Sequence, residues 1–279
     1  MQVFYDSHVH TRHSPDSQQP LPQICETAIE RGLRGFTVTD HADMGFLEDF
    51  HTFEEIKDSI AEAKAANAHY GDRLHILCGV ELGEFWDDPE SAKQILNLTN
   101  YDVVLGSVHG LHPHDFYSKT CFDEAQMPAD KLADFLKDYF CKVLAMAQKE
   151  DFDILTHLTC PLRYINGKYH RDLSARPCMD LITEILKCVI HRQKSLEVNT
   201  SGVNSFYGEL LPDREIIKRY YDLGGQMVTL GSDAHTCDRV GNAFCETAGL
   251  LKDIGFPGYY YYEQRKPCLV PWESTPRLD

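Results

Sequence analysis

Short apolar runs alternate with longer segments of helical periodicity about seven times along the chain, and this alternation restricts the possible folds more than any other feature. The runs rich in Val, Ile and Leu predict strands at Val3–Tyr5, Gly35–Thr39, His75–Val80, Asp102–Gly106, Asp153–Thr156, Ser195–Asn199 and Met227–Leu230. The segments between them predict helices, most clearly at Gln23–Arg31, Phe53–His69, Ala129–Lys149, Cys178–Arg192, Asp213–Leu223 and Gly241–Ile254. The alternation favours an α/β fold with a parallel sheet, closed or nearly closed into a barrel.

The composition is that of a globular protein with a sizeable core. Of the 279 residues, 43% are hydrophobic and 25% are charged. We find no repeat, low-complexity segment or linker, so we expect a single domain over residues 1–279. The 27 Lys and Arg against 43 Asp and Glu give a net charge of −16, which disfavours binding to nucleic acid.

The sequence gives no sign of a membrane segment or of disulfides. No apolar run is long enough to cross a bilayer, and the first ten residues lack the apolar core of a signal peptide. We therefore expect a cytoplasmic protein with no membrane partner. The ten cysteines are scattered and form no Cys-x-x-Cys motif, so we expect free thiols in a reducing compartment.

Histidines and carboxylates follow the predicted strands one after another, where barrel enzymes carry their chemistry. These residues are His8, His10, Asp16, His41, Glu81, His109, His157, Asp233 and His235. Residues two apart on an extended chain share a face, so His8 and His10 can bind one ion. Nine N and O donors without a cysteine exceed what one tetrahedral zinc needs. They predict two or three divalent ions of zinc, manganese, iron or cobalt, with a carboxylate bridging them.

Such a site favours hydrolysis of a phosphoester. Divalent ions lower the pKa of a bound water and neutralise a phosphoryl group, whose transition state needs mainly positioning and charge stabilisation. Barrels that hydrolyse cyclic amides use similar metals but usually bridge them with a lysine. Lysines are few near these strand ends, and Glu81 is the natural bridge.

Three further histidines and one segment near the predicted ligands could take part in the site. His13, His112 and His114 are close to them in sequence but off their spacing, and each is a candidate to touch metal or substrate. The stretch His112–Pro128 has little periodicity and is a candidate lid.

The strand-end motifs resemble the PHP (polymerase and histidinol phosphatase) superfamily. They are His8-x-His, Thr39-Asp-His, the lone Glu81, Ser107-Val-His, Thr156-His and Gly231-Ser-Asp-Ala-His. The resemblance runs from Tyr5 to His235, and the tail from Arg265 to Pro271 resembles the closing strand of that family. The segment from Ser107 to Tyr164 is similar to the histidinol-phosphate phosphatases of histidine biosynthesis. The resemblance implies a distorted (β/α)7 barrel with its metal site at the C-terminal ends of the strands.

The resemblance also implies a ligand set and a reaction. It assigns the ligands to three ions: His8, His10, Glu81 and Asp233 to the first, Glu81, His109 and His157 to the second, and Asp16, His41 and His235 to the third. Many members have a histidine where Asp16 stands. In the implied reaction a bridging hydroxide attacks the phosphorus of L-histidinol phosphate. Glu81 and Asp233 would be the catalytic residues, with Asp233 passing a proton to the leaving alkoxide.

A phosphate dianion also calls for arginine, whose planar fork suits it. Arg163 lies six residues after His157, and Arg239 lies four residues after His235. We expect both to bind substrate, together with Asn199 and Asn204 in the segment after the sixth strand. Three acidic residues are candidates for the amine of histidinol, although a solvated surface is the more common role of such residues: Glu84, Asp87 and Asp115.

Two alternatives remain open at this point. The substrate could be another small phosphate, such as a nucleotide or a sugar phosphate, because one fold serves many substrates. The chain could also be a non-catalytic module that keeps its metals for stability. The sequence leaves the metals and the oligomeric state undetermined.

Overall fold

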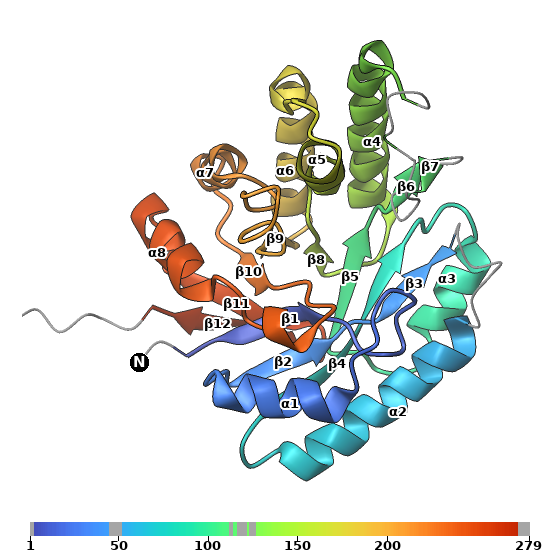
Figure 1. Cartoon of the computed structure of the whole chain (residues 1–279), viewed down its shortest axis with the longest axis vertical. Helices are drawn as coiled ribbons and strands as arrows, with labels where there is room; N and C mark the ends of the chain where they lie inside the picture. The colour runs from blue at the N-terminus through green and yellow to red at the C-terminus, as the bar shows by residue number, and fades with distance from the viewer. Residues whose placement is uncertain (1–2, 45–51, 112–113, 116–121, 123–126, 273–279) are drawn as a thin grey trace, which may run out of the picture.

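The computed structural model describes residues 3–44, 52–111, 114–115, 122 and 127–272. A mostly parallel sheet forms its centre, and the helices lie around it (Figure 1). The strands follow the order β1-β2-β4-β5-β8-β9-β10-β11-β12, and the short strand β3 pairs with β4. The fold is therefore mixed α/β, as the alternation in the sequence predicts.

Most neighbouring strands of the sheet are parallel, and only β12 runs antiparallel, beside β11. The bounds are β1 Tyr5–Val9, β2 Gly35–Val38, β3 His41–Asp43, β4 His75–Gly83, β5 Val103–Ser107, β8 Ile154–Leu155, β9 Ser195–Asn199, β10 Val228–Gly231, β11 Gly258–Glu263 and β12 Lys266–Pro271. A separate hairpin consists of β6 (Gly110–Leu111) and β7 (His114–Asp115).

Eight α-helices connect these strands in the described part of the chain. They are α1 Leu21–Glu30, α2 Thr52–Tyr70, α3 Pro89–Leu96, α4 Ala129–Lys149, α5 Cys160–Leu162, α6 Met179–His191, α7 Arg214–Asp222 and α8 Phe244–Ile254. Short turns of other helix types are η2 Arg163–Lys168, η3 Arg176–Cys178 and η4 Cys237–Arg239. Two helices begin at an aspartate cap: Asp88 accepts from the Ser91 N–H at 3.1 Å, and Asp213 accepts from the Ile216 N–H at 3.0 Å.

The first strand is the main correction to the predicted elements. We expected it at Val3–Tyr5, but β1 spans Tyr5–Val9. The apolar pattern misses its second half because Asp6, Ser7 and His8 are polar although they are buried. The predicted helix Ala129–Lys149 has the observed bounds, whereas α3 and β11 were not predicted.

The end of β1 lies beside the segment that follows β10. The His10 N–H donates to the Ala234 carbonyl at 3.0 Å, and the Asp233 N–H donates to the His8 carbonyl at 2.9 Å. These bonds bring the first and the last histidine motif of the sequence to the same edge of the sheet.

The opposite end of the strands, where β5 and β8 begin, contains packed apolar side chains and an ion pair. Tyr262 of β11 packs against Val103 and Ile154, although β5 and β8 are not neighbours of β11 in the sheet. The turn after β11 carries Arg265, whose Nε donates to Asp153 at 2.7 Å. This end is therefore filled by apolar side chains and an ion pair, which leaves the C-terminal ends of the strands for polar chemistry.

Other predictions have mixed outcomes. The nine cysteines of the described residues are free thiols, and Cys121 lies outside them. Within the same residues, no helix has the length and apolarity needed to cross a bilayer. The predicted lid His112–Pro128 lies largely outside the described residues, as does His112, and the side chain of His114 is not described.

His13 contacts two carboxylates of helix α2. Its Nδ1 bonds to Glu55 at 2.8 Å and its Nε2 bonds to Glu62 at 2.8 Å, both on α2. Arg12 also contacts Glu62, at 3.3 Å. His13 therefore ties the segment between β1 and α1 to helix α2.

This tie predicts a pH dependence of stability. Burial alone lowers the pKa of His13, but Glu55, Glu62 and the nearby Asp40 raise it above its ordinary value of 6.5. The pKa is thus higher in the folded than in the unfolded chain, so the tie stabilises fully below about pH 6.5 and is lost as the pH rises through the folded value. In His13→Gln, the free energy of unfolding of the metal-free protein in urea should fall less between about pH 6 and pH 8.5 than in the wild type.

His191→Gln is the matched control, since His191 is exposed at the end of α6. It should keep the pH dependence of the wild type. Equal pH dependence in His13→Gln and the wild type would contradict the tie.

Candidate metal centre

Glu81 of β4 lies at the centre of the cluster that the predicted ligands form, and its side chain is fully buried. Its Oε1 lies 2.8 Å from His157 Nε2 and 3.2 Å from His109 Nε2. Its Oε2 lies 3.1 Å from His8 Nε2 and 3.0 Å from His41 Nδ1. Oε2 also lies 3.4 Å from His10 Nε2. The two oxygens of one carboxylate thus face different sets of histidines.

The strand register brings these residues together. His41 of β3 lies directly beside Glu81 in the parallel pairing of β3 with β4. His8 lies near the end of β1, while His109 and His157 come two residues after β5 and β8. Because parallel strands end at the same edge of the sheet, their side chains converge there.

A second group of predicted ligands adjoins the first. Asp233 Oδ1 lies 3.4 Å from His10 Nε2 and 3.5 Å from His235 Nδ1. Asp16 Oδ2 lies 2.9 Å from His235 Nε2, and Asp16 Oδ1 lies 3.7 Å from His41 Nε2. All nine predicted ligands therefore lie in one cluster, and their binding of metal stays a prediction.

The donor atoms fit divalent cations. Several groups of three ligands have donor atoms within 4.8 Å of one another, among them His8, His10 and Asp233. The Nε2 atoms of His8 and His10 are only 3.0 Å apart. Glu81 Oε2 is buried, yet it receives no hydrogen bond from any described residue. A buried anionic oxygen without a donor is a site that a cation would stabilise.

The charges of the carboxylates also suit cations. Burial alone raises the pKa of Glu81, but His8, His109 and His41 hold it well below its usual range. Burial likewise raises the pKa of Asp233, and Arg163 and His8 hold it low. Both carboxylates are therefore ionised at neutral pH, the state in which they bind a metal.

Asp233 has a strained backbone. Its φ angle is +51°, in the left-handed region that residues other than glycine seldom adopt. Such strain persists only where the surroundings enforce it, and it is common at functional sites. Here the Asp233 N–H is held by the carbonyl of His8.

Asp40 is a buried acidic residue beside the cluster that was not among the predicted site residues. Asp40 accepts from the Thr11 N–H at 2.6 Å and from the Ser14 and Ser59 hydroxyls at 2.8 and 2.6 Å. Ser14 in turn lies 2.9 Å from His10 Nδ1. Because the Ser14 hydroxyl donates to Asp40, it accepts the Nδ1–H of His10 and leaves Nε2 free to bind. The position of Asp40 beside His41 is the sequence signal for this role.

Glu84 corrects the expectation of a solvated acidic surface. It is 1% exposed, and it accepts the N–H groups of His109 and Gly110 at 2.6 and 3.1 Å. Burial and the nearby Asp43 raise its pKa well above its usual range. Asp87 is exposed as expected, and the side chain of Asp115 lies outside the described residues.

The predicted substrate-binding residues fall into two pairs. Arg163, the first residue of η2, donates to Asp233 Oδ2 at 2.8 Å. Asn199 donates to the same oxygen at 3.4 Å. Arg239 instead donates to the Asn204 carbonyl at 3.2 Å. The first pair therefore lies directly against the ligand cluster.

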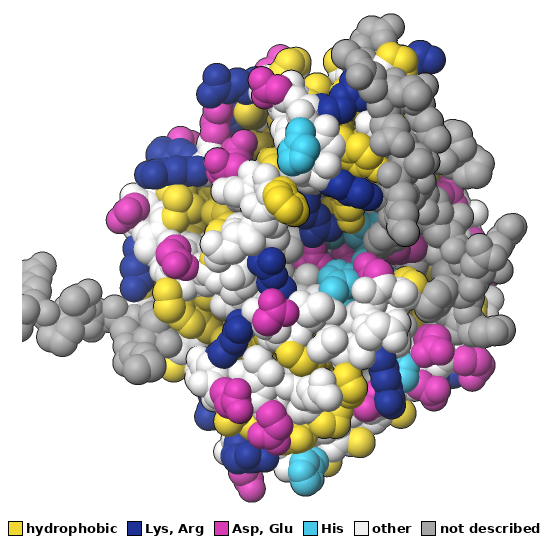
Figure 2. All heavy atoms as spheres, viewed as in Figure 1, with side chains coloured by type: hydrophobic (Ala, Val, Ile, Leu, Met, Phe, Trp, Pro, Cys, Tyr) yellow, Lys and Arg dark blue, Asp and Glu magenta, His cyan; other side chains and the backbone are white. Residues whose placement is uncertain are grey.

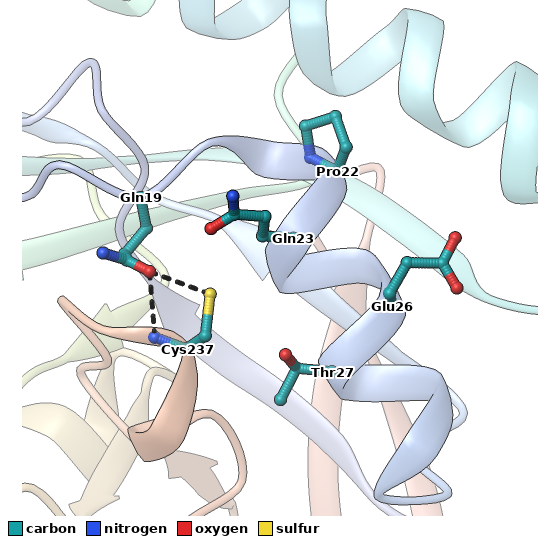
Figure 3. A pocket seen from close by; sticks show the side chains of 6 residues that line it. All are labelled: Gln19, Pro22, Gln23, Glu26, Thr27 and Cys237. Atoms are coloured by element: carbon teal, nitrogen blue, oxygen red, sulfur yellow. Dashed lines mark hydrogen bonds between the residues drawn. The ribbon is translucent and has the colours of Figure 1, made fainter.

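Figure 2 shows histidine and acidic side chains in a hollow near the middle of the viewed face, with Lys and Arg side chains beside it. A separate open groove lies against α1 (Figure 3). Its lining consists of Gln19, Pro22, Gln23, Glu26, Thr27 and Cys237. None of these is a predicted ligand or substrate-binding residue, so the candidate site is the histidine cluster.

Comparison with known proteins identifies the family. The sequence profile of the PHP domain matches residues 6–201, which include seven of the nine predicted ligands. The chain belongs to the PHP domain family. This PHP chain is 31% identical over 246 residues to a protein of Clostridium acetobutylicum named "Probable histidinol-phosphatase", covering 87% of this chain and 90% of that protein. A "Histidinol-phosphatase" of Lactococcus lactis is 27% identical over 266 residues, covering 90% of this chain and 91% of that protein.

A solved structure also resembles this PHP chain. The crystal structure of histidinol phosphate phosphatase from Lactococcus lactis, complexed with zinc, L-histidinol and phosphate, matches it with a TM-score of 0.82. The two are 25% identical, and the match covers 96% of this chain and 100% of that one. The expected family resemblance is thereby confirmed.

The central place of Glu81 predicts how metal binding depends on it. Glu81→Gln keeps the shape of the side chain but removes its charge and places an amide N–H2 against imidazole nitrogens. We expect its affinity for zinc to fall by at least about 100-fold, the upper end of the loss seen for residues that only support ligands. Metal content after reconstitution and dialysis, measured by plasma mass spectrometry, checks this.

Glu90→Gln on the exposed first turn of α3 is the matched control and should retain the metal content of the wild type. If Glu81→Gln also retained it, the central role of Glu81 would be refuted.

Proposed function

We propose that this PHP chain hydrolyses L-histidinol phosphate to L-histidinol and phosphate with two or three divalent ions. The observation that carries the proposal is Glu81, whose Oε2 faces His8 and His10 and whose Oε1 faces His109 and His157, so that it can bridge two ions. The support for the substrate comes from relatives named histidinol-phosphatase that match most of the chain, one of which was solved with zinc, L-histidinol and phosphate.

The residues that would hold the ions are those of the cluster. We assign them as follows: His8, His10, Glu81 and Asp233 to one ion, Glu81, His109 and His157 to a second, and Asp16, His41 and His235 to a third. When bound, the ions would supply a water of lowered pKa and neutralise the charge of the phosphate. Zinc, manganese, iron and cobalt all suit such N and O ligands.

Arg163 would bind the phosphate beside these ions. Its fork carries five N–H donors. The structure holds it through Asp233 at 2.8 Å, the Ser201 hydroxyl at 2.6 Å and the Tyr164 hydroxyl at 3.1 Å. The guanidinium is thus fixed at the edge of the cluster with donors to spare for phosphate oxygens. Arg239, Asn199 and Asn204 would complete the substrate-binding side chains.

Asp233 would move the proton of the reaction. Its Oδ2 is fixed by Arg163, while its Oδ1 faces His10 and His235. Because its pKa is held low, it is ionised and begins as a proton acceptor. We propose that it takes a proton from the attacking water and gives it to the leaving alkoxide as the ester P–O bond breaks.

The remaining proposals concern the whole chain. We infer that the sheet closes as a distorted (β/α)7 barrel at the bridge between Val9 and Ala234, and that residues 1–279 act as one domain. The partner would be a small anionic phosphate ester, and the protein would act in the cytoplasm without nucleic acid or membrane.

A panel of phosphomonoesters tests the substrate. With metal-reconstituted protein, we expect kcat/KM for L-histidinol phosphate to exceed that for nucleotide and sugar phosphates by about 100-fold or more. A substrate that leaves buried polar groups of the site unpaired has a much lower kcat/KM than one that pairs them. Asp233→Ala and His157→Ala should release no phosphate under the same conditions, which excludes a contaminating phosphatase.

A hundredfold preference for a nucleotide or sugar phosphate would keep the hydrolysis and refute the named substrate. Release of no phosphate from any ester, with metal shown to be bound, would favour a non-catalytic metal-binding module instead.

Arg163 can be tested by a change that keeps its charge. Arg163→Lys removes the planar fork, so we expect kcat/KM for the preferred substrate to fall by about 100-fold, as for loss of one preorganised donor to a developing anion. Arg176→Lys changes an exposed arginine paired with Glu215 and should leave kcat/KM unchanged. Unchanged kcat/KM in Arg163→Lys would contradict its role.

A further inference from the structure

Glu197 of β9 is a buried carboxylate for which neither the proposed ligand set nor the proposed reaction has a role. It is 1% exposed. Its Oε1 lies 2.7 Å from His8 Nδ1, and its Oε2 accepts the His157 main-chain N–H at 2.7 Å. Asn199 also donates to Oε2, at 3.1 Å. Both oxygens thus contact nitrogen groups of proposed ligands or of their neighbours.

These contacts determine which nitrogen of His8 can bind metal. Glu197 Oε2 accepts the His157 N–H, and Oε1 as a carboxylate oxygen is the acceptor for His8. His8 Nδ1 then carries the hydrogen that Glu197 receives. The lone pair is then left for Nε2, which faces Glu81 Oε2 at 3.1 Å and His10 Nε2 at 3.0 Å. We propose that Glu197 is a positioning residue, which sets the tautomer of His8 and fixes it relative to His157 so that both imidazoles can bind the metal centre.

The backbone leaves room for this carboxylate. A Cβ atom at Gly231 would collide with Glu197 Oε1 and would lie 2.9 Å from the Cβ of His8. Gly231 ends β10, and it is paired with Asn199 of β9 in the sheet. The absence of a side chain at position 231 therefore lets Glu197 reach His8 from a different strand.

Glu197 also joins two separate parts of the ligand set. His8 belongs to β1 and His157 follows β8, whereas Glu197 belongs to β9. In the proposed assignment His8 and His157 bind different ions that share Glu81. Glu197, which is outside the ligand set, thus fixes His8 of one ion relative to His157 of the other. These histidines are far apart in the sequence, so a local turn could not do this.

Glu197→Gln keeps the size of the side chain but changes its hydrogen bonding, so it tests the positioning role separately from packing. Glutamine offers one acceptor oxygen in place of two. The His157 N–H cannot change, so the amide oxygen stays on it and the amide N–H2 turns toward His8. His8 must then accept at Nδ1 and carry its hydrogen on Nε2, where it blocks metal binding.

The experiment uses the full chain loaded with zinc and labelled with 15N-histidine. Long-range 1H–15N spectra show which ring nitrogen of His8 carries a hydrogen, and competition with a chelator gives the zinc affinity. In the wild type we expect the hydrogen on Nδ1. In Glu197→Gln we expect it on Nε2, with zinc affinity about 10–100-fold lower, as for other partners that orient metal ligands.

Two further variants complete the design. Gly231→Ala changes no polar group but displaces Glu197, so it should also weaken zinc binding. Asp153→Asn removes a buried carboxylate that accepts the Val104 N–H at 2.8 Å at the opposite end of the strands. It controls for loss of stability alone and should bind zinc as the wild type does.

The proposal fails if His8 of the zinc-loaded wild type carries its hydrogen on Nε2, a result that needs no variant. It also fails if Glu197→Gln binds zinc like the wild type, or if Asp153→Asn weakens zinc binding equally. The inference rests on the proposed metal centre and not on its substrate. A wild type that binds zinc but releases no phosphate from L-histidinol phosphate would therefore refute the proposed function and leave Glu197 untouched.

Discussion

The site depends on one buried negative charge. A carboxylate taken fully out of water is costly unless positive charge or hydrogen bonds compensate it, and Glu81 lies near the C-terminal end of the long, buried strand β4. Its compensation comes from imidazoles on both sides, which arrive from strands on either side of β4 and from farther around the sheet. The sheet therefore has to be curved and mostly parallel for these groups to meet, and the opposite end of the strands is packed with apolar side chains. The same arrangement of strands that forms the fold thus also compensates the buried charge of Glu81.

Buried acids outside the proposed ligand set hold members of that set in place. Asp40 supports His10 through Ser14, and Glu197 supports His8. Asp6 accepts the N–H groups of Ser232 and Gly241, both at 2.9 Å, and so holds the loop that carries Asp233. Burial raises the pKa of Asp6 to about 6, although these hydrogen bonds lower it. The cluster is thus surrounded by acceptors that fix backbone and imidazole N–H groups, as is common around metal ligands.

The sequence predicts the members of the buried cluster better than it predicts the acidic residues that contact them. His8 and Glu81 could be found because residue type and position after an apolar run are both visible along one chain. Glu197 was visible too, but its partners come from β1 and β8, and no local spacing reveals contacts between distant strands. The first strand was misplaced for a related reason, since the buried face of β1 is polar and breaks the apolar pattern. Arg239 and Arg163 both follow ligand motifs, but Arg239 donates to the Asn204 carbonyl whereas Arg163 donates to Asp233. Sequence distance from a motif does not reveal this difference.

The hydrogen bonds between the end of β1 and the segment after β10 also have a consequence for folding. His8 and His10 lie near one end of the sequence, and Asp233 and His235 lie more than 200 residues later. Bringing such distant residues together has an entropic cost before their contacts form. An ion held by both ends would bind the native chain and not the unfolded one, and would stabilise it by mass action. The concentration of available metal would then affect the folded fraction of the protein as well as its catalysis.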